Sequence, residues 1–240
     1  MNQDNAKSWH AVAESLNNLA SLYRSQGRYD EAEPLYKQAL ELAKKLLGQE
    51  HLEVANTLNS LAGLYYAQER FEDAKPLFQQ ALDLRRKLLG SEHTEVANSL
   101  NNLGLLYYSQ GQYRDAEPLF QQALALRRKL LGFEHTDVAN SLNNLGLLYY
   151  AQKRYKDAEP LFKQALYLRG KLLGRNNSNV AMSLNNLAGL YESQQKYERA
   201  KSLYQHALQI LERKLGSNHP NTISIRENLQ FVIQKKQDLP

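Results

Sequence analysis

The sequence predicts an all-α protein, built as a solenoid of stacked antiparallel helix hairpins. Three observations support this fold class. A phrase of the type SLNNL returns every 42 residues, apolar residues are spaced three or four apart on both sides of a turn, and no stretch alternates apolar and polar residues as a strand would. A regular period of this length is typical of arrays in which each unit buries its apolar face against its neighbours.

The repeats are recognised from the place of the paired asparagines. Copies of the phrase begin at Ser15, Thr57, Ser99, Ser141 and Ser183, and a degenerate copy, IRENL, covers Ile225–Leu229. Segments 93–134 and 135–176 are identical at 32 of 42 positions. We therefore predict a single solenoid domain over residues 1–240. It comprises repeats at approximately 9–50, 51–92, 93–134, 135–176 and 177–218 and a capping helix at 219–237.

Each repeat is predicted to contain two helices. In the third repeat one apolar stripe runs from Val96 to Tyr107, Gly111 interrupts it, and a second stripe runs from Ala116 to Leu131. The second stripe begins among acidic residues and ends among basic ones before Gly132, as the helix dipole and glycine C-caps favour. Small residues such as Gly104 recur where the two helices must approach closely, because a larger side chain would force them apart.

A proline near the start of each second helix leaves two interpretations open. If these helices begin near Tyr29, Phe71, Tyr113 and Tyr155, then Pro34, Pro76, Pro118 and Pro160 lie too deep and remove a hydrogen bond or kink the helix. If the helices begin a few residues later, the prolines lie in the permitted first turn. The last predicted helix starts near Pro220 and has a single apolar face, as expected of a cap.

The core pattern resembles a known repeat family. Its residues in the third repeat are Leu100, Leu103, Gly104, Tyr107, Ala116, Phe120 and Ala123. This pattern resembles the tetratricopeptide repeat, and the 42-residue period with the phrases HxxVAxSLNNLxxLY and YxxAxPLxxxAL resembles the kinesin light chain type. The resemblance extends from about Trp9 to Asn228. It implies a right-handed superhelix whose concave groove binds short peptides. Leucine at the first core position and the absence of a proline that ends the second helix depart from the general repeat, but the light-chain type shares both.

A helical wheel divides the first helix of the third repeat into two faces. Leu100, Leu103, Gly104 and Tyr107 face the partner helix, and Asn98, Asn101, Asn102, Leu105 and Tyr108 lie opposite. First helices line the inner wall of such a stack, so we expect the opposite face to look into the groove. An amide can bond both the N–H and the C=O of an extended peptide, and rigid hairpins place the amides roughly 10 Å apart.

The predicted peptide-binding residues share this groove-facing place in the first helices. They are Asn18, Asn56, Asn59, Tyr66, Asn98, Asn101, Asn102, Leu105, Tyr108, Asn140, Asn143, Asn144, Leu147, Tyr150 and Asn186. Two alternatives stay open. The asparagines instead bond the neighbouring hairpin or hold water, and the second tyrosine of each YY pair is an ordinary amphipathic surface residue.

Composition and motifs narrow the function. The chain has 42% hydrophobic and 23% charged residues and no cysteine. Its net charge is +5, and the acidic and basic residues are interspersed along the chain. His51, His93, His135 and His219 recur a full hairpin apart, too far to share one metal ion, so we expect a helix-start or packing role. The basic ends LRRKLLG at 84–90 and 126–132 are explained by the helix dipole and a solvated outer face rather than by nucleic acid. No catalytic or phosphate-binding motif occurs, so we expect no enzyme activity and no cofactor.

The expected function is that of a protein–protein interaction module, an adaptor that binds an extended peptide or partner segment in the concave groove. We expect a cytoplasmic monomer that binds neither nucleic acid nor membrane, because no signal peptide or membrane span is present. The alternatives are a structural or oligomerising repeat module and a regulatory segment of a larger multidomain signalling protein. The sequence leaves the charge and identity of the partner open.

Overall fold

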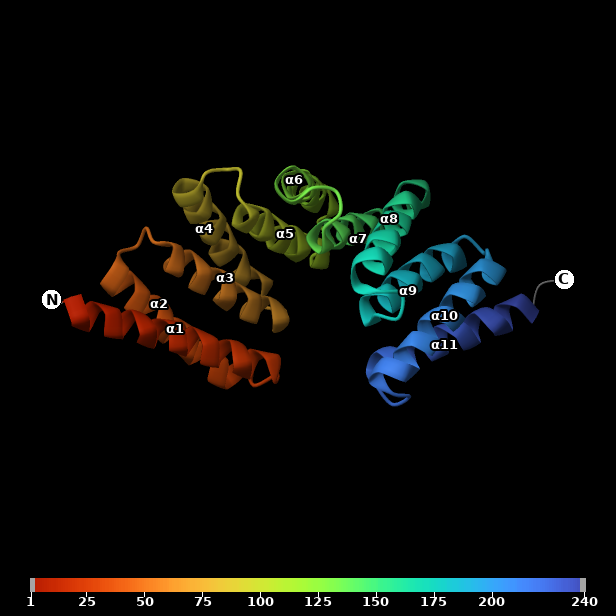
Figure 1. Cartoon of the computed structure of the whole chain (residues 1–240), viewed down its shortest axis with the longest axis horizontal. Coiled ribbons are helices and arrows are strands. Elements are labelled where there is room, and N and C mark those ends of the chain that lie inside the picture. The colour runs from red at the N-terminus through yellow and green to blue at the C-terminus, as the bar shows by residue number, and fades with distance from the viewer. Residues whose placement is uncertain (1–2, 238–240) are drawn as a thin grey trace. The chain divides into compact units, whose positions relative to one another are not determined.

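A computed structural model of the chain describes residues 3–237, which form helices and no strand (Figure 1). The helices are α1 (Gln3–Ser25), α2 (Tyr29–Leu47), α3 (Leu52–Ala67), α4 (Phe71–Leu89), α5 (Thr94–Ser109), α6 (Tyr113–Leu131), α7 (Thr136–Ala151), α8 (Tyr155–Leu173), α9 (Ser178–Ser193), α10 (Tyr197–Leu215) and α11 (Pro220–Gln237). In unit 1, which ends at Leu126, α1 packs with α2 and α3 with α4, and α2 and α4 also contact the first helix of the next repeat. In unit 2, which begins at Arg127, α7 packs with α8 and α9 with α10, and α8 and α10 contact the helix that follows each of them. The predicted all-α solenoid of five hairpins and a capping helix is confirmed. Within residues 3–237 no helix has the length and apolar character required to cross a bilayer.

Two compact units divide the chain, unit 1 at Met1–Leu126 and unit 2 at Arg127–Pro240. In unit 1 the core lies between the two helix layers and contains Tyr36, Leu64, Phe78 and Leu100, each at most 3% exposed. In unit 2 the corresponding layer contains Leu148, Phe162 and Leu190. The prediction of one domain over residues 1–240 remains a prediction, and the two units are described separately below.

The small residues predicted at close helix contacts do lie there. A Cβ atom on Gly104 would come within 2.8 Å of the Phe120 ring, and one on Gly146 within 2.8 Å of the Phe162 ring. Both distances are shorter than a carbon–carbon contact allows, so the ring occupies the space that a side chain would need. The glycines therefore set the distance between the first and second helices of the third and fourth repeats.

The structure decides the place of the four prolines. The second helices begin at Tyr29, Phe71, Tyr113 and Tyr155, so Pro34, Pro76, Pro118 and Pro160 lie inside them, and all four are exposed. Each proline removes one intrahelical hydrogen bond, because its nitrogen carries no hydrogen. The helices nevertheless continue for three further turns. The carbonyl four residues earlier faces the same outer side, where water can satisfy it.

The cap is also confirmed. In α11 the buried side chains are Thr222, Ile225, Leu229 and Val232, one face that packs against α10. The opposite face contains exposed polar and basic residues. Helix α11 therefore covers the apolar side of the fifth hairpin, as a terminal unit of an array requires.

Candidate functional site

A buried arginine joins three helices of unit 1. Arg85 of α4 is 4% exposed, and its guanidinium donates from Nη1 to the Ser99 Oγ at 2.8 Å and from Nη2 to the Asn56 Oδ1 at 2.8 Å. The Glu95 carboxylate lies 2.9 Å from Nη2. Burial lowers the pKa of Arg85 from its ordinary value and the nearby Glu95 partly offsets this, but an arginine stays charged at this depth. The charge is therefore held by the first helices of two successive repeats, α3 and α5.

The same arrangement recurs in unit 2. Arg169 of α8 is 9% exposed and donates to the Ser183 Oγ of α9 at 2.7 Å and to the Asn140 Oδ1 of α7 at 2.9 Å. Arg127, 6% exposed, donates to the Ser141 Oγ at 2.7 Å. We call the buried arginine with its asparagine and serine the seam triplet: Asn56, Arg85 and Ser99 in unit 1, and Asn140, Arg169 and Ser183 in unit 2.

The triplet corrects an expectation about the basic helix ends. A solvated outer face does not explain Arg85 and Arg127, the first arginines of the two LRRKLLG segments, because both are buried. Only the residues that follow conform to the expectation, with Lys87 and Lys129 exposed. A helical stripe places each arginine near the core edge, but its bonding partners are 29 residues before it and 14 after it, beyond the reach of a pattern confined to one helix.

A signal for the triplet is present in the sequence. The last full repeat has Met182, Leu211 and, in the helix that follows, Ile225 at the three corresponding places. Asparagine, arginine and serine are thus absent together, and three apolar residues replace them. Such joint replacement within one chain is expected when the three side chains touch, since the loss of the asparagine or the serine would take a hydrogen-bond partner from the buried arginine.

A second set of asparagines links neighbouring first helices directly. Asn102 of α5 donates from Nδ2 to the Asn59 Oδ1 of α3 at 3.0 Å, and Asn186 of α9 donates to the Asn143 Oδ1 of α7 at 2.9 Å. Asn228 of the cap bonds in the same way to Asn185, at 3.4 Å. We call these pairs the asparagine ladder. The alternative that the asparagines bond the neighbouring hairpin is therefore realised for these residues.

The prediction that all these amides look into an open groove is wrong for two of them. Asn101 and Asn143 are each only 8% exposed. The helical wheel places them opposite the partner helix, but it omits neighbouring hairpins, and in unit 2 Asn143 accepts a hydrogen bond from Asn186 of the next first helix. Asn59, Asn102, Asn144 and Asn186 are half-buried and keep part of their surface open.

The remaining predicted residues differ in their surroundings. Asn18 is exposed, and Asn98 is half-buried and donates to the Glu95 Oε1 at 3.3 Å. Tyr66 and Tyr150 share a hydrogen bond with Ser109 and Ser193 at 2.8 and 2.9 Å, and Tyr66, Tyr108 and Tyr150 each pack a ring against the aromatic residue that opens the second helix. Leu105, Leu147 and the three tyrosines are half-buried.

Several of the predicted residues come together in one cleft of unit 1. The cleft encloses about 270 Å³ and is lined by Arg24, Asn59, Gly63, Tyr66, Phe78, Asn102 and Leu105. Four of these, Asn59, Tyr66, Asn102 and Leu105, belong to the predicted set. Phe78 and Gly63 were not predicted. The lack of a side chain at Gly63 makes room for the guanidinium of Arg24, whose Nη1 would lie 2.6 Å from a Cβ there.

The charge at this place differs between the units. The Arg24 guanidinium has no hydrogen bond or ion pair with any residue in the described part of the chain. In unit 2 the corresponding residue is Glu192, which accepts a hydrogen bond from the Tyr204 hydroxyl at 2.8 Å. Burial and the adjacent Glu192 raise the pKa of Tyr204. Unit 1 thus offers a cation with unused donors at its cleft, whereas the unit 2 carboxylate already has a donor.

The recurring histidines have the structural role expected of them. The Nδ1 atoms of His51, His93, His135 and His219 accept from the backbone N–H two residues later, at 3.1–3.2 Å. Each histidine thereby satisfies one of the free donors at a helix start. This confirms the predicted helix-start role.

Comparisons with known proteins agree with this geometry. The tetratricopeptide repeat family matches five overlapping segments, residues 11–87, 54–129, 95–171, 137–213 and 179–229. The chain therefore belongs to the tetratricopeptide repeat family. No curated protein matches the chain.

The similar solved structures point to one branch of that family. BtubC (BKLC) from P. vanneervenii is 27% identical, with a TM-score of 0.75 over 88% of this chain and 84% of that one. A putative kinesin light chain of Podospora anserina with nearly identical repeats is also 27% identical, with a TM-score of 0.70 over 84% of this chain and 96% of that one. A Rap protein complexed with competence and sporulation factor has a TM-score of 0.70 at 20% identity over 92% of this chain and 64% of that one, a likeness of fold alone. The neighbours at 27% identity are thus kinesin-light-chain-like, as the sequence resemblance indicated.

Proposed function

We propose that this chain is a non-catalytic adaptor that binds an extended segment of a partner protein along its first helices. The cleft of unit 1 is one contact point. The family and its kinesin-light-chain-like members are generally interaction scaffolds, which supports the coarse function. The single observation that carries the finer proposal is the gathering of Asn59, Tyr66, Asn102 and Leu105 around one open cleft.

The cleft retains bonding capacity after the ladder is formed. Asn102 uses one of its two N–H groups on Asn59, and Asn59 uses one acceptor lone pair. The second N–H of Asn102, its carbonyl oxygen and the amide nitrogen of Asn59 remain for a peptide backbone. Arg24 adds guanidinium donors, and Leu105 and Phe78 add apolar contact. An extended backbone with a side chain directed into the cleft is the ligand that this mixture suits.

We further propose that the chain acts as a cytoplasmic monomer and binds neither nucleic acid nor membrane. The acidic and basic residues are interspersed along the chain, which supports this view because nucleic-acid binding requires bases gathered on one face. Light scattering at rising concentration should return a constant mass near 27.5 kDa. A mass that rises towards twice this value would favour the oligomerising module instead.

The adaptor proposal is tested with peptides selected from a random library on the whole chain. We expect Leu105→Lys to weaken the selected peptide at least tenfold, because it places a charge on the apolar wall. Asn102→Ala should weaken it about fivefold, the value of one hydrogen bond. Isothermal titration measures both. Gln80→Ala, on the exposed side of α4, is the matched control. Equal affinity for all four proteins, with unchanged melting temperatures, would refute binding at this cleft.

A further inference from the structure

A comparison of the third repeat with the fourth indicates a second candidate site, on the outer side of unit 2. The third and fourth repeats differ at ten positions. Four of the ten fall at the end of the second helix and in the following turn: Ala125 becomes Tyr167, Arg128 becomes Gly170, Phe133 becomes Arg175 and Glu134 becomes Asn176. Each of the four exchanges changes the size or the charge of the side chain. They lie together in the fold.

Three of the substituted residues, Tyr167, Gly170 and Arg175, line a cleft formed by α8, α9 and α10 and the turn after α8. It encloses about 590 Å³ and is lined by Leu166, Tyr167, Gly170, Lys171, Arg175, Val180, Leu184 and His206. Buried Val180 and Leu184 of α9 form an apolar floor, 4% and 3% exposed. Tyr167, 64% exposed, forms an aromatic wall. The volume lies in the range of known ligand sites.

Gly170 is the reason that the cleft is open. One repeat earlier the corresponding residue is Arg128, whose Nη2 reaches across to the Gln164 Oε1 of α8 at 3.4 Å and whose guanidinium lies 5.6 Å from the centre of the Phe133 ring. One repeat later, Gly170 stands in the place of Arg128, His206 in the place of Gln164 and Arg175 in the place of Phe133. No long side chain therefore crosses the gap from position 170. A Cβ on Gly170 would have no atom within 4 Å. Glycine within a helix costs about 1 kcal/mol relative to alanine, so its presence here is not explained by helix stability.

The rim of the cleft is basic. Arg175 has no ion pair or hydrogen bond with any described residue, and Lys171 is paired with Glu134 at 2.5 Å. A neighbouring cleft of about 260 Å³ shares His206 and adds Asn176, Gln209, Ile210, Arg213 and Lys214. None of the described residues that line the two clefts is acidic. A ligand that covers both clefts would therefore contact apolar residues at the floor and basic residues around the rim.

We propose that this outer cleft binds an acidic segment of a partner protein that inserts one leucine-sized aliphatic side chain. The aliphatic group covers Val180 and Leu184 beside the Tyr167 ring, and the flanking carboxylates contact Arg175, Arg213 and Lys214. This site is separate from the cleft of unit 1 and uses different residues, so either can fail without the other.

The probe is the peptide acetyl-Glu-Glu-Leu-Glu-Glu-amide, added to the ¹⁵N-labelled whole chain at low salt. We expect chemical-shift changes at Leu166, Gly170, Arg175 and His206. The peptide with glutamine in place of every glutamate should cause none, because binding needs the charges. The peptide with glycine in place of leucine should bind at least fivefold more weakly, because it leaves the apolar floor uncovered.

Two substitutions of Gly170 distinguish the effect of filling the cleft from the effect of changing helix stability. Gly170→Gln fills the gap with a neutral side chain and should weaken the probe at least tenfold, whereas Gly170→Ala leaves the gap open and should bind as the parent does. Both are better helix formers than glycine, so neither should unfold the chain. Equal affinity for Gly170→Gln and Gly170→Ala would overturn the proposal. So would equal affinity for the leucine and glycine peptides, or shifts confined to Asn102 and Leu105 of unit 1.

Discussion

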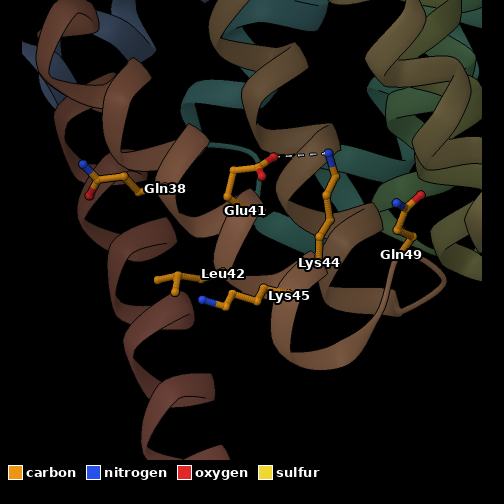
Figure 2. A pocket seen from close by; sticks show the side chains of 6 residues that line it. All are labelled: Gln38, Glu41, Leu42, Lys44, Lys45 and Gln49. Atoms are coloured by element: carbon orange, nitrogen blue, oxygen red, sulfur yellow. Dashed lines mark ion pairs between the residues drawn. The ribbon is translucent and has the colours of Figure 1, made fainter.

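The seam triplets and the C-terminal ends of the second helices belong to the same 42-residue repeat. The residue types are the same in both seam triplets, whereas they differ between repeats at the helix ends. At the seam, Arg85 and Arg169 bond the same two residue types at distances of 2.7–2.9 Å. At the outer ends, Glu41 and Lys44 of α2 form an ion pair at 3.5 Å beside a cleft of about 800 Å³, which is lined by polar and charged residues and Leu42 (Figure 2). Three repeats later, Tyr167 and Gly170 stand at those two places.

The difference shows which residues the array itself requires. A change at the seam affects two repeats at once, because the bonds of Arg85 and Arg169 join successive repeats. The outer helix ends are joined across repeats only by contacts of exposed side chains, such as Lys171 with Glu134, which contribute little to stability. The seam is therefore expected to determine stability, and the outer ends are free to differ in what they bind. The following predictions test this division, from the largest expected effect to the smallest.

Removing a seam arginine should have the largest effect. Arg169→Met removes two hydrogen bonds made by a charged donor, one to the buried Ser183 and one to the exposed Asn140, so the free energy of unfolding should fall by about 2–4 kcal/mol. Urea denaturation followed by circular dichroism measures this. Lys171→Met, two residues later on the exposed side, is the control and should change stability by less than about 0.5 kcal/mol.

The terminal repeat suggests how to repair that loss. Introducing Asn140→Met and Ser183→Ile together with Arg169→Leu copies the apolar set of Met182, Ile225 and Leu211. We expect at least half of the lost stability to return, because well-packed apolar residues can replace a buried charged network. A triple variant no more stable than Arg169→Met would show that the three residues do not act as one set.

Removing an outer proline should have the opposite sign. Pro160 lies inside α8 and is exposed, so Pro160→Ala restores a backbone hydrogen bond and should raise stability by about 1–2 kcal/mol after the gain in unfolded-chain entropy is subtracted. Pro220→Ala, at the first residue of α11, is the matched control and should give no gain. Thermal melts of both variants measure the difference.

The asparagine ladder should contribute less than a seam arginine. Asn186→Ala removes one hydrogen bond to Asn143 and should lower stability by about 1 kcal/mol. Asn18→Ala, exposed on α1, should leave it unchanged within about 0.5 kcal/mol. If both substitutions lowered the free energy of unfolding equally, the Asn186–Asn143 hydrogen bond would make no contribution to stability.

The smallest effect concerns pH. Hydrogen bonds from Lys163 and Tyr191 lower the pKa of Glu159 below 4.5 despite some desolvation. Its contribution to stability is therefore complete above that value and is lost as the pH falls through the lowered pKa of the folded state. Stability measured between pH 6 and about pH 3 should fall less steeply for Glu159→Gln than for the parent chain. Identical slopes would contradict this assignment.

The sequence predicts the fold well because a helical stripe is a local property. The five hairpins, the capping helix, Gly104 against Phe120 and the histidine N-caps all depend on residues within one repeat or on its regular return. The start of the second helices could not be decided from the sequence, because a proline is compatible with either register. Only the structure places Tyr29 as the first residue of α2 and Pro34 within it.

The candidate site was predicted less well, for a physical reason. A helical wheel separates faces of one helix but does not include its neighbours, so it could not distinguish Asn102, half-buried at the cleft, from Asn101, which is buried. The partners of Arg85 are distant in the sequence, and a long side chain can reach them from a helix edge. Joint replacement at Met182, Leu211 and Ile225 was the one available signal for that contact.

The seam triplet also determines how such an array can change in length. Each triplet takes its asparagine and arginine from one repeat and its serine from the next. Deleting residues 93–134 would therefore place Ser141 at the spacing from Arg85 that Ser99 has now. Internal copies are interchangeable, and whole copies can be gained or lost by duplication or deletion in the gene. The fifth repeat and α11, which carry apolar residues instead, can serve only as the end.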